Sequence, residues 1–355
     1  MNILDVVDER KKIDPSNFLS CVHNLPSQLR SACQLGQSLT CPPADYDLVI
    51  ILGMGGSAIG GELISACFGN DLKIPLFVVR DYDIPSFVSK KTLVIAVSYS
   101  GNTEEILSAY RRAREKGASI VSFSSGGKIK KEADDAGHPH LVLPSGFAPR
   151  AAIAYTFLPP LLLLAKLGII PDIIPDIEEA CSILDELFIE WSPELPTENN
   201  LPKKVAGEIW GKIPLIYGSG PWASVAYRWK CQINENAKLH AFSHSLPEMN
   251  HNEIMGWAQP AIDYEKFAPV LLRGTENPRN ALRAELLKNY LPQKVKLLEF
   301  KGKGKSILAQ VFSLVYLGDL VSVYLAIKGK VDPLPVLLIE NLKKELAHET
   351  ITEER

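Results

Sequence analysis

The chain has 355 residues, of which 46% are hydrophobic and 22% are charged, and its formal net charge at pH 7 is -3. This length is typical of two domains with a large buried core. The charge leaves no basic excess for a nucleic-acid backbone or an anionic membrane, so neither is an expected partner. The first residues mix acids and bases where a secretory signal has an apolar stretch, and we expect a cytoplasmic protein.

The apolar stretch at residues 157–165 is too short to span a bilayer, which takes roughly 20 residues, and it contains Pro159 and Pro160. We predict a buried helix there. The cysteines form no CxxC pair and are too sparse for a disulfide scaffold. We expect buried free thiols at Cys21, Cys33, Cys41, Cys67, Cys181 and Cys231.

Short apolar runs alternate with helical patterns through the first half of the chain. The runs lie at residues 48–53, 74–79, 92–97, 119–123 and 140–143. This alternation predicts parallel strands with crossover helices, which is an α/β fold. An apolar helical pattern near residues 153–168 follows the last run.

A proline-punctuated polar stretch after that helix marks a domain junction. We place a first domain, with a leading helical segment, at residues 1–170, and a second, with a C-terminal helix, at residues 171–355. An apolar run at residues 213–217 is followed by a glycine turn and a helical pattern, the same succession that begins the first domain's sheet. This recurrence indicates two related halves.

The loop GMGGSAIGG, residues 53–61, lies where a strand leads into a helix. Its amides and the helix dipole favour a phosphate. Ala58 stands where a dinucleotide fingerprint has its third glycine, and no Lys-Ser or Lys-Thr pair follows, so both nucleotide motifs are disfavoured. The alternative is a tight turn without a ligand.

A second loop, SYSGNTEE at residues 98–105, brings Ser98, Ser100 and Thr103 to the start of another helix, where hydroxyls can donate to phosphate oxygens. Ordinary capping by Asn102 or Thr103 is the alternative. Capping does not explain two such loops after two apolar strands, an arrangement that α/β sheets use for ligand sites at strand carboxyl ends. Together the loops predict a phosphate site.

At these loops the sequence resembles the sugar-isomerase (SIS) family, and the order of its later motifs is similar to that of the bifunctional phosphoglucose/phosphomannose isomerases. The later motifs are PRAA at 149–152, NENAK at 234–238, PEMNHNE at 247–253 and IENLKKEL at 339–346. The resemblance implies two SIS domains, each a mostly parallel sheet flanked by helices. It also implies an isomerase that interconverts glucose 6-phosphate and fructose 6-phosphate, and also mannose 6-phosphate, with no metal and no cofactor.

The resemblance also implies a role for each matching residue. Glu235 would be the base, Arg150 would lie beside the reacting carbons, and His251 with Lys343 would handle the ring oxygen. In this family the histidine reaches the site from the neighbouring subunit, which implies a homodimer. The phosphate would be held by Gly55, Gly56, Ser57, Ser98, Ser100 and Thr103.

These residue types suit aldose–ketose chemistry. Partial burial can raise a carboxylate's pKa toward the working pH, a fixed guanidinium can stabilise an enediolate, and histidine exchanges protons near neutral pH. The alternatives are that Glu235 and Arg150 are surface charges and that His251 is a turn histidine. Lys343 has an exposed neighbour, Lys344, that could take its place.

A short stretch rich in histidine also permits a metal site by spacing alone. Its candidate ligands are His240, His244, Glu248 and His251. The intervening SLPEMN breaks helical register and no HExxH motif appears, so we assign no metal there. His138 and His140, on alternate sides of a candidate strand, receive no metal role either.

Two other functions use similar loops. A regulatory module would bind a sugar phosphate without needing Glu235 or His251. The isomerase half of a glucosamine 6-phosphate-forming amidotransferase is disfavoured because no cysteine follows Met1. Dual specificity in the family has been linked to the C-terminal segment, which here offers Leu334 and Val336 and no glutamine. Room for rotation at C2 is expected, without the hydroxyl that some relatives carry.

Overall fold

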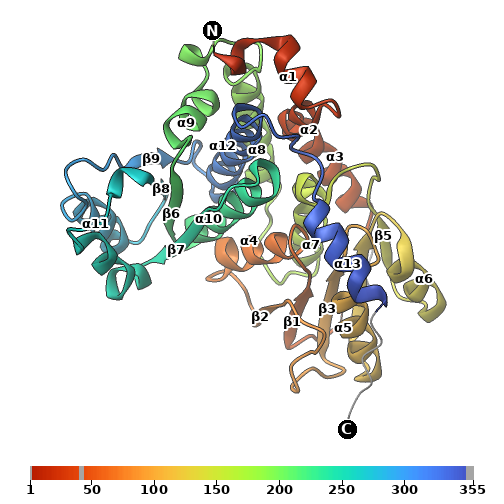
Figure 1. Cartoon of the computed structure of the whole chain (residues 1–355). Helices are drawn as coiled ribbons and strands as arrows, with labels where there is room; N and C mark the ends of the chain where they lie inside the picture. The colour runs from red at the N-terminus through yellow and green to blue at the C-terminus, as the bar shows by residue number, and fades with distance from the viewer. Residues whose placement is uncertain (1, 40–43, 349–355) are drawn as a thin grey trace.

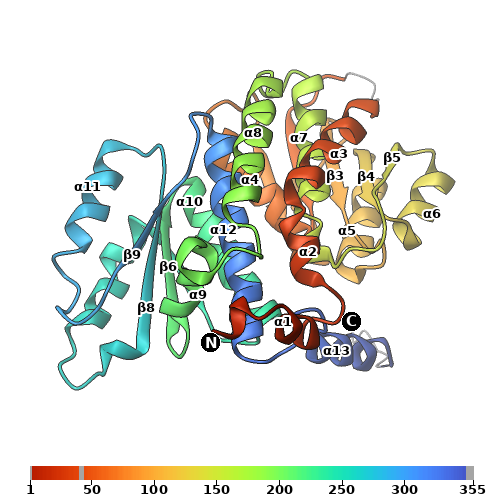
Figure 2. The ribbon, with the colours of Figure 1, turned by 90° about the horizontal axis from the view of Figure 1, so that it is seen from above.

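The computed structural model describes residues 2–39 and 44–348 and contains two sheets whose strands all pair in parallel. The first sheet has the order β2-β1-β3-β4-β5 and the second the order β7-β6-β8-β9. Figure 2 shows the sheets on opposite sides of the molecule with a layer of helices between them. The predicted α/β class is confirmed, and the order of the first four strands recurs in the second half.

The strands begin and end close to the predicted apolar runs. In the first sheet they are β1 (Leu48–Leu52), β2 (Leu76–Val79), β3 (Thr92–Val97), β4 (Ser119–Ser124) and β5 (His140–Val142). In the second they are β6 (Ile213–Ser219), β7 (Phe242–Leu246), β8 (Phe267–Arg273) and β9 (Leu298–Lys301). Every residue of β1 and β3 is buried, because helices cover both faces of the first sheet.

The helices pack on the sheets and on one another (Figure 1). In the first half they are α1 (Val7–Ile13), α2 (Phe18–His23), α3 (Leu25–Ser38), α4 (Ala58–Phe68), α5 (Glu104–Glu115), α6 (Gly127–Ala136) and α7 (Ile153–Lys166). Six more follow: α8 (Ile174–Glu190), α9 (Leu201–Ile209), α10 (Pro221–Gln232), α11 (Pro278–Leu287), α12 (Ile307–Lys328) and α13 (Leu337–His348). The predicted helix over residues 157–165 is α7, whose apolar side chains are buried.

Helix α12 is a second apolar helix that the sequence analysis did not single out. Its length and composition would allow it to cross a membrane, but 94% of its apolar window is buried inside the protein. It contacts α8, α9, α10 and α2, so it lies at the centre of the helical layer. Its burial identifies α12 as a core helix of the second half.

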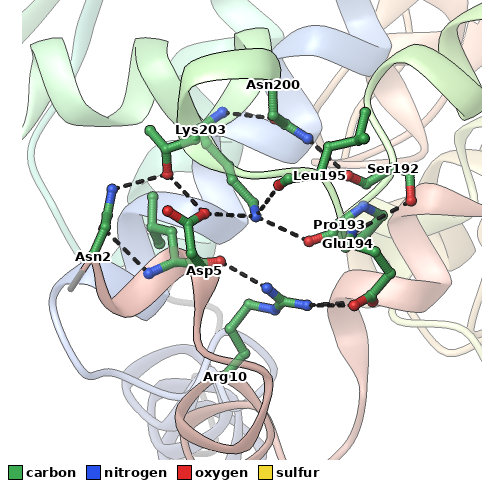
Figure 3. A network of polar contacts seen from close by, with 11 residues as sticks. Asn2, Asp5, Arg10, Ser192, Pro193, Glu194, Leu195, Asn200 and Lys203 are labelled. Atoms are coloured by element: carbon green, nitrogen blue, oxygen red, sulfur yellow. Dashed lines mark hydrogen bonds and ion pairs between the residues drawn. The ribbon is translucent and has the colours of Figure 1, made fainter.

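The segment before the first sheet attaches to the second half of the chain, as Figure 3 shows. The Lys203 ammonium donates to Asp5 Oδ1 at 3.1 Å and to the carbonyls of Pro193 and Leu195 at 2.9 and 2.7 Å. Burial lowers the pKa of Lys203, and the hydrogen bond to Asp5 opposes that shift. The leading segment therefore packs on both halves, and the boundary between residues 170 and 171 stays a prediction.

Within the described part of the chain, the cysteines are free, and Cys41 lies outside the described residues. Burial raises the pKa of Cys67 to about 12 and that of Cys181 to about 11, so both thiols stay protonated at neutral pH. Of the described cysteines only Cys181 is fully buried, so the expectation of buried thiols is wrong for the others. Their half-burial follows from positions at the edges of helix packing.

An ion pair in the core joins α10 to α12. The Arg228 guanidinium donates to both carboxylate oxygens of Asp319, at 3.0 and 2.6 Å, and Gln232 donates to the same carboxylate at 3.0 Å. Burial raises the pKa of Asp319, and the positive charge of Arg228 opposes the shift. Arg228 also donates to the Arg150 carbonyl at 2.9 Å, so the pair fixes the backbone beside Arg150.

Replacing Asp319 with alanine would leave Arg228 charged and buried without its carboxylate. We expect the free energy of unfolding to fall by about 3–5 kcal/mol in urea denaturation. Asp319→Asn keeps the side-chain shape and should cost less. Glu9→Ala, which removes an exposed partner of Lys12, is the control and should leave the midpoint unchanged. A loss below about 1 kcal/mol for Asp319→Ala would contradict this account.

Candidate active site

The strand order places two loops side by side at one edge of the first sheet. In the order β2-β1-β3-β4-β5, strand β2 is added on one side of β1 and the later strands on the other, so the strand order switches between β1 and β3. Ligands of such sheets bind beyond the carboxyl ends of the strands at this switch point. β1 leads into the glycine loop and β3 into residues 98–103. The loops touch, because the Tyr99 amide donates to Ser57 Oγ at 3.2 Å. The sheet therefore brings the two predicted phosphate loops together.

The glycine loop requires its glycines for two different reasons. Gly55 has a φ of 50°, a conformation that L side chains rarely adopt. At Gly56 a Cβ atom would lie 2.9 Å from the Pro149 carbonyl oxygen and 3.0 Å from the Arg150 amide nitrogen. Gly56 therefore lets the loop pack directly against the turn that carries Arg150.

The hydroxyls of this second loop hydrogen-bond within the loop and make no cap bond to α5. Ser98 is buried and donates to Thr103 Oγ1 at 3.0 Å, whereas Ser100 is exposed and accepts from the Asn102 amide at 3.3 Å. Thr103 occupies the N-cap position of α5 but makes no side-chain cap hydrogen bond. The prediction of Thr103 as a cap residue of α5 is confirmed in position, and the hydroxyls of Ser100 and Thr103 lie beside the amino end of α5.

Arg150 lies in the short helix η2 (Pro149–Ala151) and is 3% exposed, so it is not a surface charge. Its Nε donates to Asn236 Oδ1 at 2.5 Å, and its Nη2 donates to the carbonyls of Pro333 and Leu334 at 2.9 and 2.8 Å. Its Nη1 is 3.7 Å from Glu235 Oε2. Burial lowers the pKa of Arg150, and Glu235 opposes the shift. The guanidinium is thus held in one orientation, with one nitrogen directed to Glu235.

Glu235 lies in η4 (Ile233–Ala237), a π-helical turn that continues α10. Such turns are rare and frequently occur at functional sites. The Glu235 side chain is 28% exposed and lines a cavity of about 580 Å³ together with Lys238 and residues 331–339. The turn therefore presents a half-buried carboxylate to a cavity, with a fixed cation beside it.

Asn236 connects this site to the core. Its side chain is buried, accepts from Arg150 Nε and donates to Ser322 Oγ on α12 at 2.8 Å. Ser322 in turn donates to the Asp319 carbonyl at 2.6 Å. The sequence analysis named Asn236 only as part of NENAK and missed its role, because its partners Arg150 and Ser322 are distant in sequence.

The structure does not bring His251 or Lys343 to this cavity within one chain. His251 ends the short helix η5 (Glu248–His251) and is exposed, and Lys343 and Lys344 are exposed on α13. Among the described residues no hydrogen bond or ion pair links His251 or Lys343 to Glu235 or Arg150. Glu235, Arg150 and the phosphate loops form one contiguous group from which these two residues are separate.

The histidine-rich stretch does not form a cluster. His244 Nδ1 lies 3.3 Å from Glu253 Oε2, and Tyr217 donates to Glu253 Oε1 at 2.7 Å. Burial, chiefly, raises the pKa of Tyr217, so its hydroxyl remains a donor. In residues 2–39 and 44–348, no three His, Cys, Asp or Glu side chains converge in a group that could hold a metal ion.

The chain matches family models for the SIS domain at residues 45–163 and for the bacterial phospho-glucose isomerase C-terminal SIS domain at residues 198–346. A solved glucose-6-phosphate isomerase like protein from Thermus thermophilus has a TM-score of 0.64 at 20% identity, covering 97% of this chain and 99% of that one. That likeness supports the fold of the whole chain.

Two curated relatives differ in their activity. The D-glucosamine-6-phosphate 4-epimerase of Sulfolobus acidocaldarius is 32% identical, covering 78% of this chain and 82% of its own. The bifunctional phosphoglucose/phosphomannose isomerase of Caldicellulosiruptor bescii is 45% identical over 331 residues, which is 92% of this chain and 98% of that protein. With both halves matched and the resemblance of its motifs confirmed, this chain belongs to the bifunctional phosphoglucose/phosphomannose isomerase family, whose members are built from two SIS domains.

Proposed function

We propose that this protein interconverts glucose 6-phosphate and fructose 6-phosphate, and mannose 6-phosphate and fructose 6-phosphate, by moving a proton between C1 and C2. The observation that carries the proposal is the carboxylate of Glu235, directed into a cavity beside the buried Arg150. The activity for which the 45% identical relative is named supports the same reaction. We expect it to act in the cytoplasm, in glycolysis and gluconeogenesis.

The substrate phosphate is held where the two loops meet. Amides of Gly55 and Gly56 and the amino ends of α4 and α5 favour an anion there. Hydroxyls donate to its oxygens, and the contact between Ser57 and the Tyr99 amide keeps the two loops together. The hydroxyls in this site are those of Ser57, Ser98, Ser100 and Thr103.

The proton transfer falls to Glu235. A carboxylate takes the proton from C2 of the open-chain aldose and returns it to C1, and the enediolate between these steps carries negative charge. Arg150 stabilises that charge, and its hydrogen bonds to Asn236 and to two carbonyls mean that it need not reorient during the reaction. Each of these steps is acid–base chemistry and needs no metal.

His251 and Lys343 open the sugar ring in this proposal. Because neither residue touches Glu235 within one chain, we propose that the enzyme is a homodimer in which His251 enters the site of the partner subunit. Histidine can give and take a proton near neutral pH, as opening the ring requires. Lys343 is preferred to Lys344, although both are exposed on α13.

The choice between glucose and mannose phosphates depends on space beside C2. Val336 lines the cavity, and the Leu334 carbonyl accepts a hydrogen bond from Arg150. Neither side chain carries an amide or hydroxyl, so these two side chains offer no hydrogen bond to a group on C2. Coupled assays with both aldoses measure the balance. The competing outcome is 4-epimerase activity on glucosamine 6-phosphate, for which the 32% identical relative is named.

Glu235→Gln keeps the shape of the side chain but cannot accept the C2 proton. We expect kcat to fall at least about 100-fold, the loss typical of removing a general base, while binding of 6-phosphogluconate persists. The control, Glu198→Gln, changes an exposed glutamate that is not part of the proposed site and should keep full activity. Wild type should place deuterium at C2 of glucose 6-phosphate in heavy water. Near wild-type turnover in folded Glu235→Gln would disprove the role of this base.

Ser100→Ala combined with Thr103→Val removes two hydroxyl donors from the phosphate site. Hydrogen bonds to charged groups contribute about 1.5–3 kcal/mol each, so KM should rise at least about tenfold with a smaller change in kcat. Isothermal titration with 6-phosphogluconate should show the same loss of affinity. Unchanged affinity would mean that the phosphate binds elsewhere.

Mixed dimers test the shared site. Inactive His251→Ala and inactive Glu235→Gln, mixed under conditions of subunit exchange, should recover activity because half of the sites in each hybrid then hold both intact residues. Exchange is verified by native mass spectrometry of differently tagged subunits. Absence of recovery after verified exchange would place both residues in one subunit's site or remove one of them from the mechanism.

A further inference from the structure

The segment of residues 331–336, which joins α12 to α13, is held by two cations. Arg150 donates to the carbonyls of Pro333 and Leu334. The Lys238 ammonium lies 2.9 and 3.0 Å from the carbonyl oxygens of Asp332 and Pro333. The Pro333 carbonyl thus accepts from both side chains, and the segment is fastened against the site at that point.

The same ammonium also binds the turn that carries Glu235. Lys238 Nζ lies 2.9 Å from the Glu235 carbonyl oxygen and 3.2 Å from that of Asn236. These carbonyls are at the carboxyl end of a π-helical turn, where backbone acceptors lack partners within the helix. One ammonium therefore lies over four carbonyls, two from each segment, and links them.

The backbone at Lys238 is arranged for this contact. Its φ is 56° and it occupies the C-cap position after η4, where glycine is the common residue because it has no Cβ. A lysine in this left-handed conformation is uncommon. Its side chain folds back over the turn it ends, which a glycine could not do.

Helix α13 has little else to hold it. Leu337 is 64% exposed and Leu338 is 86% exposed, so the start of the helix buries little apolar surface. Its position depends on the 331–336 segment. That segment lines the same 580 Å³ cavity as Glu235, and α13 carries Lys343.

We propose that Lys238 is a positioning residue that fastens the 331–336 segment to the Glu235 turn and so sets the wall of the active-site cavity and the placement of α13. This proposal rests on the proposed isomerase function of the site. Lys238 touches neither substrate phosphate loop, so its loss acts on the reacting carbons and leaves phosphate binding in place.

The electrostatic surroundings agree with this role. Burial, and next the charge of Arg150, lower the pKa of Lys238 to about 8, while Asp332 and Glu235 oppose the shift. Arg150 is on η2, Glu235 on η4 and Asp332 on the fastened segment, so three different elements contribute a charge near Lys238. Perturbed groups of this kind gather at functional sites. As pH rises through about 8 the ammonium loses a proton and a donor, and the link weakens.

The test compares Lys238→Met, which keeps the length of the side chain without donors, with Lys238→Arg, which keeps charge and donors at all working pH values. Lys238→Met should speed amide hydrogen exchange in residues 331–346 and lower kcat about 10- to 100-fold, with unchanged affinity for 6-phosphogluconate. Lys204→Met, an exposed position on α9, is the matched control and should change none of these values.

Lys238→Arg should retain most of the kcat and the slow exchange. Wild type should lose kcat as pH rises through about 8, and this alkaline fall should move to higher pH in Lys238→Arg. Faster exchange without loss of kcat, or loss of kcat without faster exchange, would overturn the proposal, as would an alkaline fall that Lys238→Arg leaves in place. If wild type isomerises none of the three hexose 6-phosphates, the proposed function fails, and the exchange measurement alone decides whether Lys238 fastens the segment.

Discussion

The buried ion pair of Arg228 and Asp319 is the interaction on which the site depends. Taking two charges out of water is costly, and the geometry must be good to offset that cost. Here Arg228 donates to both oxygens of Asp319 and to the Arg150 carbonyl, so the pair also fixes the turn of Arg150. Helix α12, which carries Asp319, also carries Ser322, and Ser322 holds the Arg150 guanidinium through Asn236. The orientation of the Arg150 guanidinium is therefore built into the core.

Much of the fold could be predicted from apolar runs alone. The predicted run at residues 92–97 begins and ends at the same residues as β3. A strand that is buried on both faces is apolar throughout, so its ends are clear in the sequence. The positions of the two loops could also be predicted, since β1 and β3 end in them, whereas phosphate binding there stays a prediction. Helix α12 escaped notice because Asp319 and Gln310 interrupt its apolar pattern, and only the structure shows their partners Arg228 and Thr275.

The site was harder to predict than the fold. The NENAK motif identified Glu235, but the sequence could not show that Arg150, in a distant part of the chain, would lie 3.7 Å from it. That contact depends on how two sheets pack through a shared helical layer. The contacts of Asn236 and Lys238 were missed for two different reasons. Asn236 donates to Ser322, which is distant in sequence. Lys238 donates to backbone carbonyls, which carry no sequence signal. The catalytic and binding roles of Glu235, Arg150, His251, Lys343 and the two loops all stay predictions.

The central position of α12 has a consequence for how the protein is made. The Tyr316 hydroxyl donates to the His23 carbonyl, and α12 contacts α2, α8 and α9, which are all synthesised earlier. A nascent chain that has not yet released residues 307–328 from the ribosome exposes the apolar faces of these helices. The first sheet can form during synthesis, whereas the contacts of α2 with α12 must wait until residues 307–328 have left the ribosome. Among α2, α8 and α9, helix α2 waits longest for its contact with α12, and chaperones have their longest opportunity to bind it.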